Sequence, residues 1–300
     1  MPAPLLMVMA TLLFATMGVC VKLASEFYAA SEIVMYRGLV GMTAMALMCR
    51  QQGLTLKTRV PGMHLWRSIS GVTSLCLWFY AIGKLPLATA MTLNYMSSVW
   101  MALFLLGGAV LMGAQKLDWR LMASVLLGFV GVALILRPTV DEQQLWHGLA
   151  GLLSGMLAAM AYLQVTALGR AGEPELRVVF YFSAGGAIAG ALVTAVTEGG
   201  LQHHTPWGAA LLLAVGLLAT AAQVCLTRAY SIGRPLVNAC LQYLGIVFSF
   251  IYGMLLFKDP LTWLAAIGML LIIGAGIAAT LLRAKVAPPP KDSQFNPNES

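Results

Sequence analysis

The sequence has little charge. Only 10% of its 300 residues are Asp, Glu, Lys or Arg, whereas soluble domains carry about 25%. Apolar residues make up 60% of the chain, above the about 45–50% of soluble domains. Because so few charges cannot cover a surface in water, we expect lipid to solvate the chain. This excludes a secreted domain, a cytosolic Rossmann enzyme and a nucleic-acid-binding domain, and the net charge of +7 is spread over short loops.

Patterns of catalytic and metal sites are also missing. The chain has no H-E-x-x-H motif, no G-x-S-x-G motif and no C-x-x-C pair. The cysteines lie in or beside apolar runs, as small core residues do: Cys20, Cys49, Cys76, Cys225 and Cys240. The histidines lie at loops or span edges: His64, His147, His203 and His204. We therefore predict no cofactor, no metal site and no enzymatic activity, although a membrane enzyme, a channel and a sensor stay open as alternatives.

Long apolar stretches are what the sequence does contain. A helix needs about 20 apolar residues to cross a bilayer, and ten stretches qualify: 4–24, 31–49, 66–84, 87–112, 118–136, 147–168, 177–197, 207–230, 235–257 and 261–282. The prolines near these stretches fall between them or in a first turn, where the missing N–H costs least. We therefore predict an all-α membrane protein of ten continuous transmembrane helices, followed by a disordered tail over 285–300.

Charge at the span ends predicts the orientation. An even number of spans puts both termini on one side, and basic residues gather on the cytoplasmic side of membrane proteins. With both termini cytoplasmic, thirteen basic residues lie on the inner side and four on the outer: Lys22, Lys84, Arg137 and Lys258. The first span lacks a basic leader and an A-x-A site. We expect it to remain as an uncleaved helix.

The two halves of the chain resemble each other. Cys76-Leu77, Tyr80-Ala81-Ile82-Gly83 and Pro86-Leu87 recur, in order and about 149 residues later, as Cys225-Leu226, Tyr230-Ser231-Ile232-Gly233 and Pro235-Leu236. This order predicts a duplication, with one five-helix repeat over 1–140 and a second over 141–284. Because five is odd, the second repeat enters the membrane from the opposite side. Inverted repeats are typical of carriers, although channels are also built this way.

These motifs resemble the drug/metabolite transporter superfamily, EamA type. The resemblance includes the segment Ser31-Glu32-Ile33-Val34-Met35-Tyr36-Arg37, the Pro-Leu-x-x-Ala run from Pro86, and Gly-rich fifth and tenth spans such as Gly128-Phe129-Val130-Gly131 and Gly274-Ala275-Gly276. It implies a carrier of the bacterial inner membrane, often an exporter of amino acids and other metabolites. Some similar proteins import S-adenosylmethionine or similar nutrients. The resemblance also implies a cavity lined mainly by spans one, three, four, six, eight and nine.

Polar residues inside the spans are the candidate substrate contacts. A polar group in hydrocarbon needs a partner or a wet cavity, and amides and hydroxyls also hold packed helices together. We place these residues at the substrate cavity: Trp78, Asn94, Tyr95, Ser98, Tyr162, Gln223, Thr227, Asn238, Gln242 and Tyr243. Such a lining favours a zwitterionic or amphipathic small molecule and suits a polyanion poorly. No nucleic-acid partner is expected, and the chain is predicted to be a monomer or a homodimer in the bilayer.

Arg37 is the most informative charge, because it lies well inside the second span. A buried guanidinium is costly, so we expect it to pair with Glu32 or Glu26 as an anchor of the outer gate. Direct binding of a substrate carboxylate is the alternative. No Asp or Glu lies in the middle of a span, which predicts that transport uses no carboxylate-based proton relay.

Overall fold

A computed structural model of the chain describes residues 1–111, 142–197, 201–233, 241–259 and 262–286. It also describes the short runs 126–128 and 130–131 and the single residues 120, 123, 134 and 238. Every regular element among these residues is a helix, so the predicted all-α class is confirmed for them. Most of the predicted fifth span, Cys240 and the tail lie outside the described residues.

The helices begin and end close to the predicted limits. Their bounds are α1 Ala3–Ala24, α2 Ala30–Gln51, α3 Pro61–Lys84, α4 Leu87–Tyr95, α5 Ser97–Leu111, α7 Glu142–Arg170, α8 Glu175–Thr197, α9 Pro206–Ile232, α11 Leu244–Tyr252, the π-helix η2 Gly253–Phe257 and α12 Trp263–Val286. Proline opens α3 and α9, where its fixed φ suits a first turn. Within the described part of the chain, five helices are long and apolar enough to cross a membrane: α1, α2, most of α7, α8 and α9.

Two predicted spans are not continuous helices, which corrects the sequence-based expectation. The span over 87–112 breaks into α4 and α5 at Met96, and the span over 235–257 has a turn at Tyr243 before α11. In each break an N–H bonds to the carbonyl three residues earlier: Val99 to Met96 at 2.9 Å and Ile246 to Tyr243 at 3.0 Å. Such a 3₁₀-type bond tightens the helix without any proline. The prolines therefore gave no sign of these turns.

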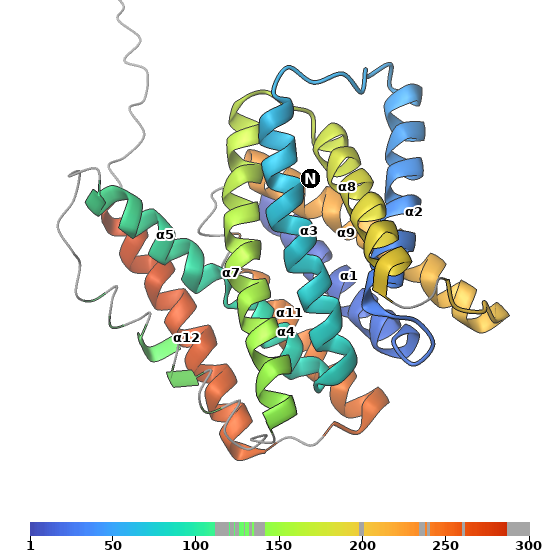
Figure 1. Cartoon of the computed structure of the whole chain (residues 1–300). Coiled ribbons are helices and arrows are strands. Elements are labelled where there is room, and N and C mark those ends of the chain that lie inside the picture. Colours follow the sequence, from blue (N-terminus) through green and yellow to red (C-terminus); the bar gives the residue numbers. More distant parts are fainter. Residues whose placement is uncertain are drawn as a thin grey trace, which may run out of the picture.

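Helix pairs between the two halves of the chain build the bundle (Figure 1). α1 packs along α9, α3 along α7, and α2 along α8, while α4 crosses α11. Glycine permits the closest of these approaches. A Cβ at Gly38 in α2 would collide with backbone atoms of Ser183 and Ala187 in α8, and one at Gly190 would lie 2.6 Å from the backbone nitrogen of Met35. The outer pair α5 and α12 lies beside this bundle (Figure 1).

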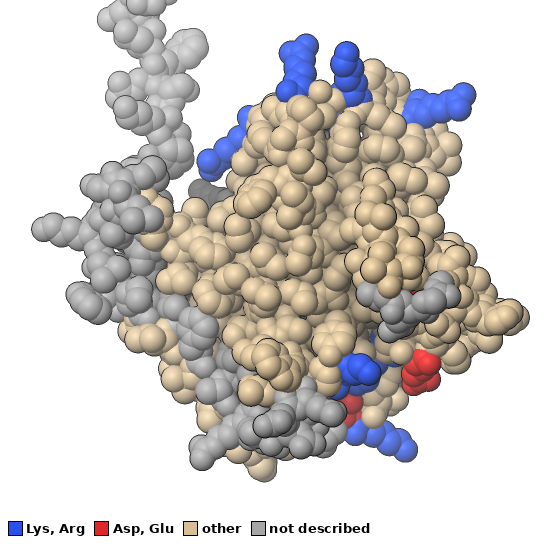
Figure 2. Space-filling view, in the orientation of Figure 1, with Lys and Arg blue, Asp and Glu red and all other residues tan. Residues whose placement is uncertain are grey.

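The surface matches a protein surrounded by lipid. Large apolar side chains face outward along the helices, such as Leu192 and Leu270 with exposed fractions of 63% and 68%. In the view of Figure 2, Lys and Arg gather at the two ends of the molecule, and a broad band without charge separates them. The acidic side chains in that view lie at the end opposite the loop between α2 and α3. Apolar outward faces of this kind are stable in hydrocarbon and would aggregate in water.

Candidate substrate-binding site

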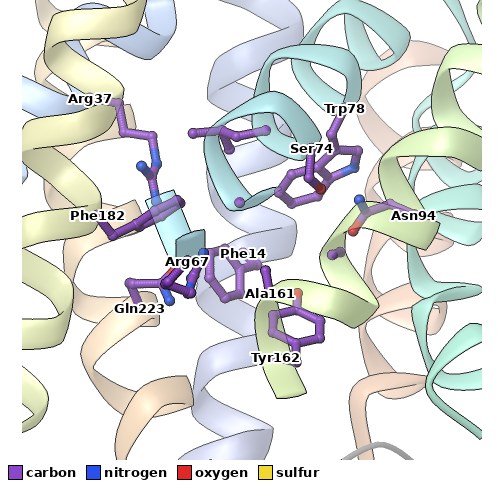
Figure 3. A pocket seen from close by; sticks show the side chains of 13 residues that line it. Phe14, Arg37, Arg67, Ser74, Trp78, Asn94, Ala161, Tyr162, Phe182 and Gln223 are labelled. Carbon is purple, nitrogen blue, oxygen red and sulfur yellow. The ribbon is translucent and has the colours of Figure 1, made fainter. Parts of the chain in front are cut away.

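A small cavity lined by polar and aromatic side chains lies in the middle of the bundle (Figure 3). Seven helices contribute to its wall, namely α1, α2, α3, α4, α7, α8 and α9. Its volume is about 40 Å³, which holds a few water molecules and falls well short of the roughly 300–1,000 Å³ of a small-molecule pocket. The helices must therefore move apart before a metabolite can enter. Five of the six spans that the family resemblance implied contribute to the wall, and α2 and α8 are added to them. The described part of the ninth span, which contains α11, contributes no residue to it.

Two arginines occupy one side of the cavity. Arg37 of α2 and Arg67 of α3 place their guanidinium carbons 5.0 and 4.1 Å from the ring centre of Phe182 in α8. Each arginine is only 3% exposed. Figure 3 shows Phe182 next to both, with Gln223 beside Arg67. The result is a cationic wall, built around one aromatic ring at the centre of the bundle.

Arg67 was missed as a site residue, because the predicted span begins at residue 66, which puts Arg67 at the span edge among the thirteen basic residues of the inner side. α3 actually begins at Pro61, so Arg67 lies in its second turn. Gly71, one turn further on, leaves the space that the Arg67 guanidinium fills: a Cβ there would collide with Nη1 of Arg67 and lie 2.9 Å from the Phe182 ring. A glycine one turn after an arginine is the sequence signal that could have identified Arg67 as a site residue.

The cost of burying these two cations is not balanced within the described part of the chain. Removing one ionised side chain from water costs several kcal/mol even after relaxation. A cation–π contact with a desolvated ring returns about 2 kcal/mol. Nε and Nη1 of both arginines are buried without a hydrogen-bond partner among the described residues. The cavity wall thus contains two positive charges, and their buried Nε and Nη1 donors are unfilled among the described residues.

The predicted pairing of Arg37 with Glu32 is not what the structure shows. Glu32 lies in the first turn of α2, and its Oε2 accepts the backbone N–H of Gln202 at 3.5 Å. Arg37 lies five residues further along the same helix, on the opposite side, where it faces Phe182. Residues five apart on a helix point in different directions, which explains the separation. Glu32 therefore lies at the end of α2 and away from the cavity.

Hydroxyl and amide groups form the other side of the cavity. Asn94 of α4 donates from Nδ2 to Oγ of Ser154 in α7 at 3.0 Å, and Ser74 of α3 donates to the Ser154 carbonyl at 2.7 Å. These bonds tie three helices together. They leave the carbonyl oxygen of the Asn94 amide as an acceptor. Asn94 therefore both joins packed helices and lines the cavity.

Aromatic rings complete the wall. Trp78 contacts Phe14 edge to face with ring centres 6.3 Å apart, and Tyr162 stacks on Tyr230 at 5.5 Å. Trp78 offers a buried indole N–H that has no partner among the described residues. Such rings give an apolar surface with a polar edge, which suits the uncharged part of an amphipathic metabolite.

The structure brings together only some of the predicted site residues. The cavity wall includes Arg37, Trp78, Asn94, Tyr162 and Gln223. The other predicted residues are buried but are not part of that wall: Glu32, Tyr95, Ser98, Thr227, Asn238, Gln242 and Tyr243. Thr227 accepts from Gln223 at 3.4 Å and so lies one step behind the cavity, whereas Asn238 donates to the Ala229 carbonyl at 2.6 Å as an interhelical contact. The ring of Tyr95 fills the space left by Gly245 where α4 crosses α11.

An ion pair closes one end of the bundle. Lys22 at the end of α1 donates to Asp259 at 3.1 Å, and Oδ2 of Asp259 accepts the Leu87 N–H at the start of α4 at 2.9 Å. The aspartate thus holds the ends of α1, α4 and η2 together. Both charges are partly shielded, with exposed fractions of 19% and 15%.

A second polar cluster lies at the opposite end, around Glu173 in the α7–α8 loop. Its carboxylate accepts from Thr58 at 2.9 Å and from Arg177 at 3.0 Å, and it meets Nε2 of His64 at 3.2 Å. Burial opposes the charged form, but these hydrogen bonds outweigh it, so the pKa of Glu173 is lowered. The cluster joins the α2–α3 and α7–α8 loops. Within the described part of the chain no group of three or more His, Cys, Asp or Glu residues could hold a metal.

Comparison with known proteins identifies the family. The model of the EamA-like transporter family matches the chain twice, over residues 1–137 and 145–281. The chain belongs to the EamA-like transporter family. It is therefore a membrane transporter of the drug/metabolite superfamily, and the resemblance found in the sequence is confirmed. The EamA-like family and the names of its relatives are those of transporters and not of enzymes.

Relatives of this EamA-like chain have different named substrates. The pseudopaline exporter CntI of Pseudomonas aeruginosa is 33% identical over 282 residues, which cover 91% of this chain and 94% of that one. An S-adenosylmethionine uptake transporter of Rickettsia bellii is 24% identical, covering 68% and 67%. A riboflavin transporter of Rhizobium johnstonii is 27% identical, covering 72% and 68%. Export and uptake thus both occur among similar proteins.

A solved crystal structure shares the fold. It superimposes with a TM-score of 0.67 at 19% sequence identity, and the match covers 95% of this chain and 99% of the other. At this identity the likeness speaks for the fold alone.

Proposed function

We propose that this EamA-like transporter exports small organic metabolites, amino-acid-like or otherwise zwitterionic or amphipathic, across the bacterial inner membrane by alternating access. The observation that carries the proposal is the cavity inside the bundle, lined by arginine, amide, hydroxyl and aromatic groups from seven helices. A polar cavity deep in a lipid-facing bundle costs free energy unless it serves a solute. With a volume of about 40 Å³ the cavity is too small for a metabolite, so transport requires conformations in which it is wider.

The proposed architecture is ten transmembrane helices in two inverted repeats, 1–140 and 141–284, with both termini and the tail 285–300 in the cytoplasm. Two features support it. The family model matches each half of the chain, and helix pairs recur with halves exchanged, since α1 packs on α9 as α3 packs on α7. Inverted repeats give a carrier two related conformations around one site.

Export is the proposed direction, because the relative that matches most of this chain at 33% identity is an exporter. Uptake of a nutrient such as S-adenosylmethionine is the alternative, favoured by the uptake transporter among the more distant relatives. Direction follows from gradients as well as structure. Vesicles of both orientations are therefore needed to decide it.

The test uses purified protein in liposomes, and inside-out and right-side-out membrane vesicles from cells that produce it. Saturable counterflow of a metabolite mixture, detected by mass spectrometry, is expected, with accumulation in inside-out vesicles. Flux that does not saturate would instead indicate a channel, and product formation would indicate an enzyme. Accumulation only in right-side-out vesicles would replace export by uptake.

We also propose that transport needs no carboxylate within the membrane as a proton relay. Among the described residues, the buried Glu32 lies at the end of α2 and not in the cavity wall. Transport by the Glu32→Gln variant is expected to keep its dependence on pH. Loss of proton-driven flux in this variant alone would place a relay at the membrane edge.

A further inference from the structure

Two buried cations face one aromatic ring in the cavity. The guanidinium groups of Arg37 and Arg67 lie within 5.0 Å of the centre of the Phe182 ring, so they are less than twice that distance apart. Each side chain is 97% buried, being only 3% exposed. Both come from helices of the first half of the chain and meet on a helix of the second.

No counter-charge for these cations is found within the described part of the chain. The ion pairs there join Lys22, His64, Arg177 and Arg228 to carboxylates, and neither cavity arginine takes part. Nε and Nη1 of each arginine also lack a hydrogen-bond partner among the described residues. Buried charges are normally paired, because an isolated one is costly to desolvate. Two adjacent unpaired cations therefore indicate that an anion completes the site.

We infer that the cavity binds organic anions with two or more carboxylates, one held by each arginine. Guanidinium groups match carboxylates in shape and charge, and two arginines around one ring suit two carboxylates on one small molecule. The amides of Asn94 and Gln223 and the rings of Trp78 and Phe14 then face the rest of the solute. The inference rests on the proposed transport function. It also replaces the expectation that the cavity suits polyanions poorly, which arose because Arg67 was placed at the inner edge of its span.

Gly71 allows the Arg67 side chain to take its position in the site. It leaves the room in which the Arg67 guanidinium lies against Phe182. A methyl group at residue 71 would displace Arg67 while keeping its charge in the cavity. This gives a variant that separates the position of the charge from its presence.

The test measures thermal stabilisation of the purified full-length protein by defined ligands, since a ligand stabilises the state it binds. The probes are linear dicarboxylates of three to six carbons, aspartate, glutamate and citrate. The matched controls are the corresponding diamides and glutamine, with sodium sulfate at equal ionic strength. At least one dicarboxylate is expected to raise the melting temperature, while its diamide and sulfate do not. No shift with any dicarboxylate, or an equal shift with diamide or sulfate, would overturn the inference.

Variants test which side chains are responsible. Arg37→Gln and Arg67→Gln are each expected to lower the affinity for the stabilising dicarboxylate at least about tenfold, as loss of a charge-assisted hydrogen bond does. Gly71→Ala is expected to lower this affinity by a smaller factor. Arg228→Gln is the matched control, because that arginine is 54% exposed at its side chain and lies outside the cavity wall. Because removing an unpaired buried charge relieves a cost, the variants should fold, and circular dichroism checks this.

Counterflow separates failure of this inference from failure of the proposed function. If the protein transports neutral or cationic solutes with saturation, and both Arg→Gln variants transport them as well as wild type, transport stands and the anion site falls. If no solute shows saturable counterflow, the proposed function itself falls.

Discussion

At the scale of single residues, Gln223 and Gln242 test whether transport depends on a glutamine that lines the cavity or on any glutamine buried in the bundle. Both are buried glutamines within the bundle, with exposed fractions of 6% and 1%. Gln223 belongs to the cavity wall and Gln242 does not. The sequence could not distinguish them, because each is a glutamine inside an apolar span with a tyrosine on the same span.

We expect Gln223→Leu to lower transport about 3- to 10-fold, as loss of one hydrogen bond to a ligand does, and Gln242→Leu to lower it less. Initial rates of counterflow, divided by the amount of inserted protein, measure this. Equal losses in the two variants would contradict the assignment of the cavity wall.

A residue outside the membrane, Glu173, sets a dependence of stability on pH. Hydrogen bonds to its buried carboxylate lower its pKa in the folded protein. A carboxylate with a lowered pKa stabilises the fold at neutral pH, and this contribution disappears as pH falls from the ordinary value through the folded one.

We therefore expect Glu173→Gln to lose about 1–3 kcal/mol at pH 7, the usual cost of leaving a buried partner unsatisfied. The difference from wild type should persist at pH 6 and shrink only below the ordinary Glu pKa of 4.5. Thermal unfolding in detergent at stepped pH measures it. A difference that vanishes already between pH 7 and 6 would instead implicate His64.

At the scale of elements, the closest helix pair depends on small residues. α2 and α8 approach until the Gly38 position touches the backbone of α8, and Gly190 touches the backbone of α2. Close packing replaces the hydrophobic effect as the force between helices in lipid, so these glycines hold the two halves of the chain together.

We expect Gly38→Ala to destabilise the protein by about 1–3 kcal/mol through overpacking. Gly108→Ala is the control, because a Cβ at that helical position would meet nothing within 4 Å. Melting temperatures of the two variants in the same detergent compare them. Equal stability of Gly38→Ala and wild type would show that α2 and α8 are further apart than described.

At the scale of the whole molecule, the Lys22–Asp259 pair is the contact that we expect to open and close. It joins the ends of α1, α4 and η2 at one end of the bundle. In the proposed orientation this end faces the cell exterior. Breaking the pair should shift the population toward outward-open molecules by no more than the pair contributes.

We expect Lys22→Met to raise the rate at which a membrane-impermeant thiol reagent labels a cysteine placed at Ser74, from outside, by about 1.4- to fivefold, since such pairs contribute about 0.2–1 kcal/mol. The native cysteines are replaced beforehand. Lys258→Met is the control, because Lys258 is exposed and makes no ion pair among the described residues. An unchanged rate in Lys22→Met would remove the pair from the gate.

From the sequence alone it follows that lipid surrounds this protein, that it is helical, where most of the described helices begin and end, and which family it resembles. These are local properties, since hydrophobic length and proline position are read along one stretch of chain. The packing of the helices sets which polar residues converge. It brought Arg67 to Phe182 through the space at Gly71, left Glu32 away from Arg37, and bent two spans at Met96 and Tyr243. Convergence of this kind depends on how seven helices pack against one another, which no single stretch of sequence encodes.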